Sequence, residues 1–419
     1  MATLHDLEQA GARLEAIAQR TDSGQSREAA GRVDAILEQV QRQGDAALLE
    51  LTERFDGVRP DPLRVPQGQL EAAWNATPTD LQEALKLAHR RIVDFHQRQK
   101  PADLAVTGVH GEQLGRRWRP VERAGLYVPG GRASYPSTVL MNAVPATVAG
   151  VQRLVMVTPP GPDGLVNQTV LAAAHLAGVE EIYRVGGAQA IAALAYGTET
   201  IPRVDVISGP GNLYVTLAKK AVYGRVAIDS LAGPSEVLVI ADHTARADQV
   251  AADLMAQAEH DPLAAAILIT TSDALAAALP AAVEAQLAAH PRAAIVRQAL
   301  NDWGLIVVCD DLAEAARLSD RFAPEHLELL VEDPEALAER IQHAGAIFVG
   351  PHTPEAVGDY LAGPNHTLPT CATARFAGAL SVETFLRHTS LIRFNREALA
   401  ATGAAVITLA ESEGLHSHA

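Results

Sequence analysis

Along the chain, short runs of hydrophobic residues alternate with longer stretches in which hydrophobic residues have helical spacing. From position 125 onward, short runs of β-branched residues, such as 154–158 and 182–185, are separated by alanine-rich stretches with helical spacing, such as 165–177 and 190–196. Short apolar runs predict buried strands, and apolar residues three or four positions apart predict the helices that cover them. The alternation therefore predicts an α/β fold with a parallel sheet.

The same alternation starts again after the turn at Gly233-Pro234-Ser235. The predicted strands are 237–241, 265–270, 304–309, 327–331 and 346–349. The predicted helices are 245–259, 312–322 and 334–343. Gly345 is placed to cap the last of these helices at its C-terminus. A second α/β lobe is therefore expected, and the stretches 32–55 and 70–100 are expected to add covering helices.

Composition and charge narrow the class of protein. The chain has 419 residues, of which 48% are hydrophobic, and its formal net charge is −16. An acidic chain repels the nucleic-acid phosphate backbone, so no DNA or RNA partner is expected. The longest charge-free run, 133–152, contains prolines and hydroxyl groups that do not suit a membrane span, so no membrane association is expected. Two cysteines and the absence of a signal-like N-terminus favour the cytoplasm.

Three glycine turns are candidates for a nucleotide site. They are Tyr127-Val-Pro-Gly-Gly131, Gly186-Gly-Ala-Gln189 and Gly209-Pro-Gly-Asn212. The last two each follow a strand and open a helix, where backbone N–H groups favour an anionic group such as a pyrophosphate. None of them matches G-x-G-x-x-G. Each turn on its own also fits a simple tight connection, and the polar residues beside all three favour a dinucleotide site.

Two groups of polar residues are candidate metal ligands. Gln257 and His260 are three positions apart and share one face of a predicted helix near its end. Asp359 precedes an unusually polar loop at 363–369 and is a reasonable ligand for a hard metal. A histidine in a last helical turn also simply complements the helix dipole. Since the chain has no H-E-x-x-H motif, any metal site must be assembled from distant residues.

A third group pairs an acid with an imidazole. Glu325 and His326 are adjacent where the chain enters a predicted strand, after Pro324. Successive strand residues point to opposite faces, so both reach one substrate only if the backbone is irregular there. An ordinary ion pair is the competing interpretation. The chain ends with Glu413, His416 and His418 on a tail.

Taken together and in this order, these motifs resemble histidinol dehydrogenase. The segments that carry the resemblance are Gly-Leu-Tyr-Val-Pro-Gly-Gly at 125–131, Val-Gly-Gly-Ala-Gln-Ala-Ile at 185–191, Gly-Pro-Gly-Asn at 209–212, Ala-Gly-Pro-Ser-Glu-Val-Leu at 232–238, Gln-Ala-Glu-His at 257–260 and Pro-Glu-His-Leu-Glu at 324–328. The resemblance extends over nearly the whole chain. It implies two incomplete Rossmann-like lobes with helical extensions, in an intertwined homodimer whose tail crosses to the partner's active site.

On this resemblance we expect four segments. A helical N-terminal arm covers 1–23, and a larger discontinuous α/β lobe combines 24–126 with 237–375. A second, nucleotide-binding α/β lobe covers 127–236. A helical tail at 376–419 contributes to the partner's site.

The resemblance also implies an activity: L-histidinol is oxidised through L-histidinaldehyde to L-histidine, with two NAD⁺ reduced and one Zn²⁺ per subunit. The implied metal ligands are Gln257, His260, Asp359 and His418, the last from the other subunit. His418 is preferred to His416 because it stands five residues after Glu413. His326 is the implied base, and Glu325 is implied to activate water. The implied NAD-binding residues are Tyr127, Gln189 and Asn212. The implied substrate-binding residues are Ser235, Gln257, His260, His326, Asp359, Glu413 and His418.

Four alternatives stay open at this point. A related zinc and NAD dehydrogenase could oxidise another small alcohol, such as a sulfonated diol, on the same scaffold. A zinc hydrolase could use Glu325 to activate water, although it would need no nucleotide turns. A thiol-dependent aldehyde dehydrogenase could use Cys371 as its nucleophile. A binding or structural protein would leave the polar residues of these motifs without a role.

Overall fold

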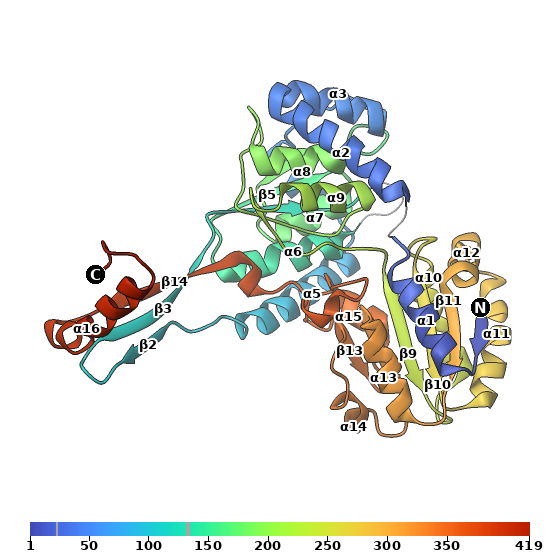
Figure 1. The fold of residues 1–419 in the computed structure, drawn as a ribbon. Coiled ribbons are helices and arrows are strands. Elements are labelled where there is room, and N and C mark those ends of the chain that lie inside the picture. Colours follow the sequence, from blue (N-terminus) through green and yellow to red (C-terminus); the bar gives the residue numbers. More distant parts are fainter. Residues whose placement is uncertain (22–23, 131–134) are drawn as a thin grey trace.

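Two α/β lobes and one projecting arm make up the molecule (Figure 1). The computed structural model describes residues 1–21, 24–130 and 135–419. Gly131, the last residue of the first glycine motif, lies outside the described residues. The α/β class with parallel sheets, predicted from the alternating pattern, is confirmed.

One lobe is built on a six-stranded sheet in the order β1-β11-β10-β9-β12-β13, in which every pair of neighbours is parallel. Its strands are β1 (Ala2–Leu4), β9 (Glu236–Ala241), β10 (Ala265–Thr270), β11 (Gly304–Val308), β12 (His326–Leu330) and β13 (Ala346–Val349). One face is covered mainly by α1 (Leu7–Ala18) and α13 (Leu312–Phe322). The other face is covered by α10 (Ala247–Ala258), α11 (Asp273–Leu287) and α12 (Ala293–Trp303). The short helices α14 (Pro334–Ala338) and α15 (Glu355–Tyr360) flank β13 in the sequence.

The second lobe is built on a five-stranded parallel sheet in the order β6-β5-β4-β7-β8. Its strands are β4 (Arg123–Tyr127), β5 (Arg153–Thr158), β6 (Glu181–Arg184), β7 (Val206–Ser208) and β8 (Ala227–Ile228). The helices on one face are α2 (Gly24–Gln43), α3 (Asp45–Asp56), α8 (Gly187–Tyr196) and α9 (Leu213–Val222). The helices on the other face are α4 (Gln67–Ala76), α5 (Thr79–Gln97), α6 (Pro136–Ala149) and α7 (Gln168–Leu176).

The inner strands of the two parallel sheets are buried on two faces, which explains their continuous apolar runs. In β9, all six residues are buried, and in β10 all six are as well. Each fully buried valine, leucine or isoleucine contributes about 1.5–3 kcal/mol relative to an exposed one. This burial provides a rigid frame whose strand ends carry the candidate site.

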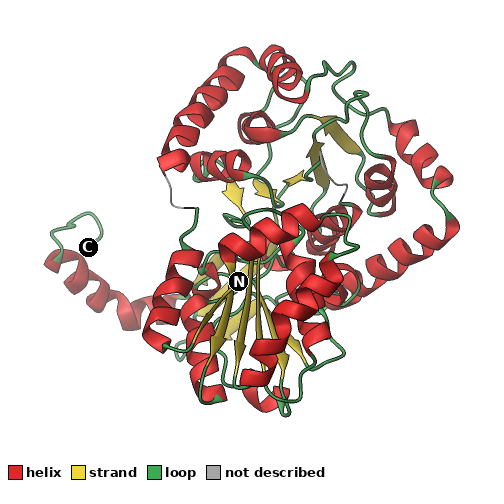
Figure 2. Cartoon of the chain, turned by 90° about the vertical axis from the view of Figure 1, so that its right-hand side faces the viewer, coloured by secondary structure: helices red, strands yellow, loops and turns green. Residues whose placement is uncertain are grey.

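The arm consists of a small antiparallel sheet and a helix that project from the body (Figure 1). The sheet has the order β14-β3-β2, with β2 (Leu104–Thr107), β3 (Gln113–Pro120) and β14 (Leu386–Arg393). Helix α16 (Arg396–Ser412) follows β14, and two short 3₁₀ helices, η1 (Thr373–Arg375) and η2 (Val382–Phe385), precede it. Both views place the C-terminus well away from the two lobes (Figure 2).

The division of the chain differs from the expected one. Helices α2 to α5, within the expected 24–126 segment, pack on the five-stranded sheet and not on the sheet that contains 237–375. The prediction assigned these helices to the wrong sheet because they precede most strands of both sheets in the sequence. Only tertiary packing shows which sheet they cover. The expected lobe made of 24–126 with 237–375 is therefore wrong in its first part.

Both chain ends contain strands where only helices were expected. Residues 2–4 form β1 and pair with β11 at the edge of the six-stranded sheet. Residues 386–393 form β14 and pair with β3. Three or eight residues in a partly exposed edge strand leave little apolar periodicity to detect. The helix expected at 334–343 ends at Ala338, so Gly345 does not cap it.

Across the described ranges, no helix is both long enough and apolar enough to cross a membrane.

Candidate functional site

Glu325 and His326 lie at the amino-terminal edge of the six-stranded sheet, where β12 begins beside β9. Both side chains bind the main chain of one residue, Glu236. The Glu236 N–H donates to Oε2 of Glu325 at 2.9 Å, and Nδ1 of His326 lies 3.0 Å from the Glu236 carbonyl oxygen. Oε2 of Glu325 and Nδ1 of His326 are 3.7 Å apart. Glu325 lies in a bend just before β12, which begins at His326, so the alternation of side chains along a regular strand does not apply to this pair.

His326 is buried and held as a neutral imidazole. Burial lowers its pKa from 6.5 to about 4, against the opposing effect of Asp359. Because the carbonyl of Glu236 can only accept a hydrogen bond, Nδ1 carries the proton. Nε2 then holds the lone pair; it has no hydrogen-bond partner and lies 4.0 Å from Oδ1 of Asp359. The arrangement presents an unprotonated nitrogen to the site.

Glu325 is buried beside other carboxylates. Burial raises its pKa well above 4.5, and the hydrogen bond from Glu236 opposes this rise only in part. Gly345 packs against the main chain here, because a Cβ on it would lie 2.6 Å from the Glu325 carbonyl oxygen. The close approach lets the N–H of Ala346 donate to that oxygen at 2.9 Å. This is the structural reason for a glycine at position 345.

The candidate metal ligands meet beside this pair. Ligand atoms of His260, Glu355 and Asp359 all lie within 4.8 Å of one another. Gln257, one turn before His260, is buried, and its Oε1 has no hydrogen-bond partner. An unpaired buried amide oxygen is costly unless something binds it. Imidazole nitrogen with amide and carboxylate oxygens is a donor set that fits Zn²⁺.

A loop from the same lobe completes this side of the site. Nδ1 of His366 lies 3.0 Å from the main-chain oxygen of Asp359, and burial lowers the pKa of His366. Nδ2 of the neighbouring Asn365 donates to the Met141 carbonyl of α6 at 2.6 Å, so the loop joins the two lobes. Ser235 lies half-buried immediately before β9.

The three glycine turns lie at the carboxyl-terminal edge of the five-stranded sheet. Tyr127 ends β4, and its hydroxyl accepts the N–H of Gly187, at the start of α8, at 3.1 Å. Burial raises the pKa of Tyr127 to about 12, so its hydroxyl keeps its proton. Gln189, in the first turn of α8, is buried, and its Oε1 has no hydrogen-bond partner.

The third turn is braced from inside by an ion pair. Lys219 and Asp229 form an ion pair in which their side chains are only 2% and 3% exposed. Nζ of Lys219 donates to the Gly209 carbonyl oxygen at 3.0 Å, and the Gly209 N–H donates to Oδ2 of Asp229 at 2.8 Å. Gly209 has a φ of 115°, and a Cβ there would lie 2.1 Å from the Tyr127 carbonyl oxygen, so only glycine fits. Asn212 caps α9 by accepting the N–H groups of Tyr214 and Val215.

Two predicted residues are not brought to this site within one chain. Glu413 and His418 are exposed and lie in the projecting arm, past the end of α16 (Figure 1). By contrast, Asp359 lies close to both His260 and His326, Glu325 is next to His326, and Gln257 stands near the end of α10, one turn before His260.

Comparison with known proteins identifies the family of this chain. The family model described as histidinol dehydrogenase matches residues 19–419. The chain belongs to the histidinol dehydrogenase family. A histidinol dehydrogenase of Parasynechococcus marenigrum (strain WH8102) is 69% identical over 416 residues, covering 99% of this chain and 95% of that protein. One of Prochlorococcus marinus (strain MIT 9313) is 69% identical, covering 99% and 94%.

A solved structure supports the fold of this histidinol dehydrogenase family member. The crystal structure of histidinol dehydrogenase from Elizabethkingia anophelis has a TM-score of 0.89 and 38% sequence identity, and the match covers 93% of this chain and 90% of that one. The whole architecture, with both lobes, is therefore that of the family.

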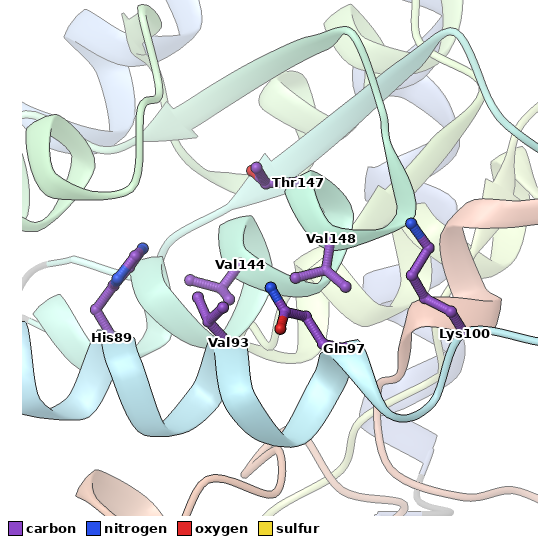
Figure 3. A pocket seen from close by; sticks show the side chains of 7 residues that line it. All are labelled: His89, Val93, Gln97, Lys100, Val144, Thr147 and Val148. Carbon is purple, nitrogen blue, oxygen red and sulfur yellow. The ribbon is translucent and has the colours of Figure 1, made fainter.

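A separate cavity of about 330 Å³ lies between α5 and α6, away from the residues just described (Figure 3). It is lined by His89, Val93, Gln97, Lys100, Val144, Thr147 and Val148. None of the predicted site residues lines it, so it is not the candidate catalytic site of this histidinol dehydrogenase family member.

Sequence reasoning missed three residues of the site. Glu355 stands four positions before Asp359 on α15, a spacing that places both on one helical face and could have revealed it. His366 lies in the polar loop at 363–369 that the sequence singled out without assigning its histidine. Glu236 acts on Glu325 and His326 through its main chain, which leaves no signal in its residue type.

Proposed function

We propose that this chain catalyses the zinc-dependent oxidation of L-histidinol to L-histidine through bound L-histidinaldehyde, with two NAD⁺ as oxidants. The observation that carries the proposal is the cluster of His260, Glu355 and Asp359 beside Glu325 and His326, in a member of the histidinol dehydrogenase family. These reactions are the last two steps of histidine biosynthesis. We assign them to the cytoplasm, where the two unpaired cysteines stay reduced.

We assign Gln257, His260 and Asp359 as zinc ligands, together with His418 of the partner subunit. The buried, unpartnered Oε1 of Gln257 supports this assignment, as does the closeness of His260 to Asp359. Glu355 adds a buried carboxylate, whose pKa burial raises well above 4.5 and Asp359 raises further, so a cation would relieve an unfavourable charge. When bound, the metal would hold and orient the amino alcohol.

In the first oxidation, we assign His326 as the base. The hydroxyl proton of histidinol moves to Nε2 of His326 while the hydrogen on the adjacent carbon leaves as hydride to NAD⁺. Nε2 is the unprotonated nitrogen because Nδ1 is engaged by the Glu236 carbonyl, and the lowered pKa keeps the ring neutral. A positioned base of this kind accelerates a reaction by about 10²- to 10⁴-fold.

In the second oxidation, we assign Glu325 to activate water. Water adds to the aldehyde carbon and gives a proton to the Glu325 carboxylate, and the resulting hydrate loses a second hydride to a second NAD⁺. The raised pKa of Glu325 suits it to take up this proton at neutral pH. Overall, histidinol, one water and two NAD⁺ give histidine carboxylate, two NADH and three protons.

We assign the nucleotide to the carboxyl-terminal edge of the five-stranded sheet. The strand order changes direction between β4 and β7, and ligands of such sheets bind in the crevice at that point. Tyr127 and Gly209 lie at the ends of these two strands. The unpartnered Oε1 of Gln189 supports its assignment as a contact. Asn212 uses Oδ1 to cap α9, so we expect its contact to come from the Nδ2 amino group.

We propose that the active unit is a homodimer with shared sites. Glu413 and His418 lie in the arm and away from the cluster of their own chain, so a second chain would have to supply them (Figure 1). Helix α16 exposes Leu399, Val406 and Leu409 at 60, 50 and 65%. Exposed apolar residues gathered on one element favour a protein interface. Ser235 of one chain and Glu413 of the other would then both bind the substrate.

The test counts NADH formed per histidinol, with and without a chelator. We expect two NADH per histidinol, loss of the activity on metal removal and recovery with Zn²⁺. One NADH per histidinol would reject the two-step reaction. Absence of saturable NAD⁺ binding would favour a zinc hydrolase, and turnover of another small alcohol in place of histidinol would favour a related dehydrogenase.

A further inference from the structure

A buried ion pair lies directly behind Glu325 and His326. Arg20, two residues after the end of α1, contacts Glu236 at 2.9 Å between Nη1 and Oε1, and both side chains are 0% exposed. Pairs buried this completely add little net stability, because desolvation of the two charges offsets their attraction. The position of this pair indicates a role in the site itself.

The guanidinium of Arg20 forms five hydrogen bonds, three of them with the segment that leads into β9. Its guanidinium has five N–H groups, and five acceptors surround it. Besides Glu236, it donates to the carbonyl oxygens of Ile17 at 2.8 Å, Leu263 at 2.7 Å, Pro234 at 2.8 Å and Ser235 at 3.2 Å. Three consecutive residues, 234–236, are thereby fixed to the end of the N-terminal helix.

Glu236, held in place by Arg20, forms main-chain hydrogen bonds with both candidate catalytic residues, Glu325 and His326. Its N–H holds the Glu325 carboxylate, and its carbonyl oxygen accepts the Nδ1 proton of His326. On its other side, Oε1 of Glu236 also accepts the N–H of Cys371 at 3.2 Å. A shift of the Glu236 main chain would therefore move the Glu325 carboxylate. It would also remove the hydrogen bond that keeps the proton of His326 on Nδ1.

We propose that Arg20 and Glu236 are positioning residues of the reaction, which act through the main chain of Glu236 to hold the Glu325 carboxylate and the Nδ1-protonated form of His326. The inference rests on the proposed function, since it assigns roles in that reaction. The N-terminal segment therefore belongs to the catalytic machinery, although Arg20 itself does not touch the substrate.

The test compares Arg20→Met, Arg20→Lys and Glu236→Gln in the full-length, zinc-loaded protein. Arg321→Met is the matched control, because Arg321 also ties α1 to the body through a glutamate, Glu15, at 2.9 Å, but on the surface. The measurements are kcat with histidinol, kcat with histidinaldehyde, KM for NAD⁺ and bound zinc.

We expect Arg20→Met to lower both kcat values by about 10²-fold, the loss typical of a displacement near 1 Å, with the KM for NAD⁺ and the zinc content unchanged. Arg20→Lys should recover only part of this loss, since an ammonium cannot serve five acceptors. Glu236→Gln keeps the volume and an acceptor, so it should lose less than Arg20→Met. Arg321→Met should match the wild type.

Wild-type kcat in Arg20→Met would overturn the inference, and so would a fall in kcat matched by an equal rise in the KM for NAD⁺. If Arg20→Met does not fold, wild-type kcat in both Arg20→Lys and Glu236→Gln would overturn it. A wild-type protein that forms no NADH from histidinol would instead overturn the proposed function, and this inference with it.

Discussion

Burial gives two adjacent side chains opposite shifts in pKa. It raises the pKa of the Glu325 carboxyl well above 4.5 and lowers the pKa of the His326 imidazole to about 4. In both cases the charged form is disfavoured, since neither group is fully compensated by a partner. These shifts keep the His326 imidazole in its unprotonated form, and they make the Glu325 carboxylate a stronger base than an exposed one, which suits both groups to accept protons.

At the same scale, Cys371 is not expected to act as a nucleophile. Burial, reinforced by the Glu236 carboxylate, raises the pKa of its thiol to about 11, so the reactive thiolate is scarce at neutral pH. We predict that Cys371→Ser keeps most of the activity, measured as kcat for histidinol and for histidinaldehyde. Glu325→Gln in the same assay shows what loss of a catalytic group looks like. Near-complete inactivity of Cys371→Ser would contradict this prediction and favour the thiol mechanism.

At the scale of elements, α5 shows how a polar residue enters a core. Its buried residues, Leu85, Ala88, Ile92 and His96, fall on one stripe at helical spacing. His96 ends the stripe fully buried, with Nδ1 2.8 Å from the Ile92 carbonyl oxygen and Nε2 without a hydrogen-bond partner. Burial in the core therefore favours the neutral form of this imidazole.

A dependence of stability on pH follows for this helix. Burial lowers the pKa of His96 below its usual 6.5, so the unfolded chain binds the proton more tightly. The stability associated with the neutral ring is fully present above pH 6.5 and is lost as the pH falls toward the lowered pKa. We predict that His96→Leu reduces the loss in free energy of unfolding between about pH 7.5 and about pH 5.5, measured by urea denaturation.

The control for this prediction is His352→Leu, which alters an exposed histidine. It should leave the pH dependence of the wild type unchanged. An equal loss of stability on acidification in the wild type and in His96→Leu would show that His96 does not contribute.

At the scale of the whole molecule, the proposed catalytic and nucleotide sites lie at opposite edges of the two parallel sheets. Glu325 and His326, the proposed catalytic pair, lie at the amino-terminal edge of one sheet, and the glycine turns lie at the carboxyl-terminal edge of the other. The loop at 363–370 connects the lobes through Asn365 and α6. The arm carries Glu413 and His418 away from both lobes, which is why the proposed active unit needs two chains (Figure 1).

Subunit mixing tests this arrangement directly. We predict that His260→Ala and His418→Ala chains are each inactive alone, and that a refolded equal mixture regains about a quarter of wild-type activity. Half of the dimers would be mixed, and each would hold one site with an intact body and an intact tail. Activity is measured as NADH formation with histidinol. A mixture that stays inactive, while wild-type chains refolded in parallel recover, would rule out crossing tails.

The sequence by itself determined the α/β class and the positions of most strands, and it singled out the residues that we propose for the site. Continuous apolar runs and helical spacing arise from local burial, so 265–270 and 346–349 were predicted as observed. Gln257, His260, Asp359, Glu325 and His326 were singled out because the motifs around them, in this order, resemble those of histidinol dehydrogenase; each residue alone also has an ordinary structural explanation.

Only the tertiary structure shows which helices cover which sheet. Only the tertiary structure shows the hydrogen bonds between the main chain of Glu236 and the distant side chains of Glu325 and His326. The apolar pattern of helices α2 to α5 does not say which sheet they cover, and the structure packs them on the five-stranded sheet. The edge strands β1 and β14 form because a neighbouring strand offers its hydrogen bonds. The contacts of Glu236 with Glu325 and His326 use backbone groups that every residue has, so no sequence pattern encodes them.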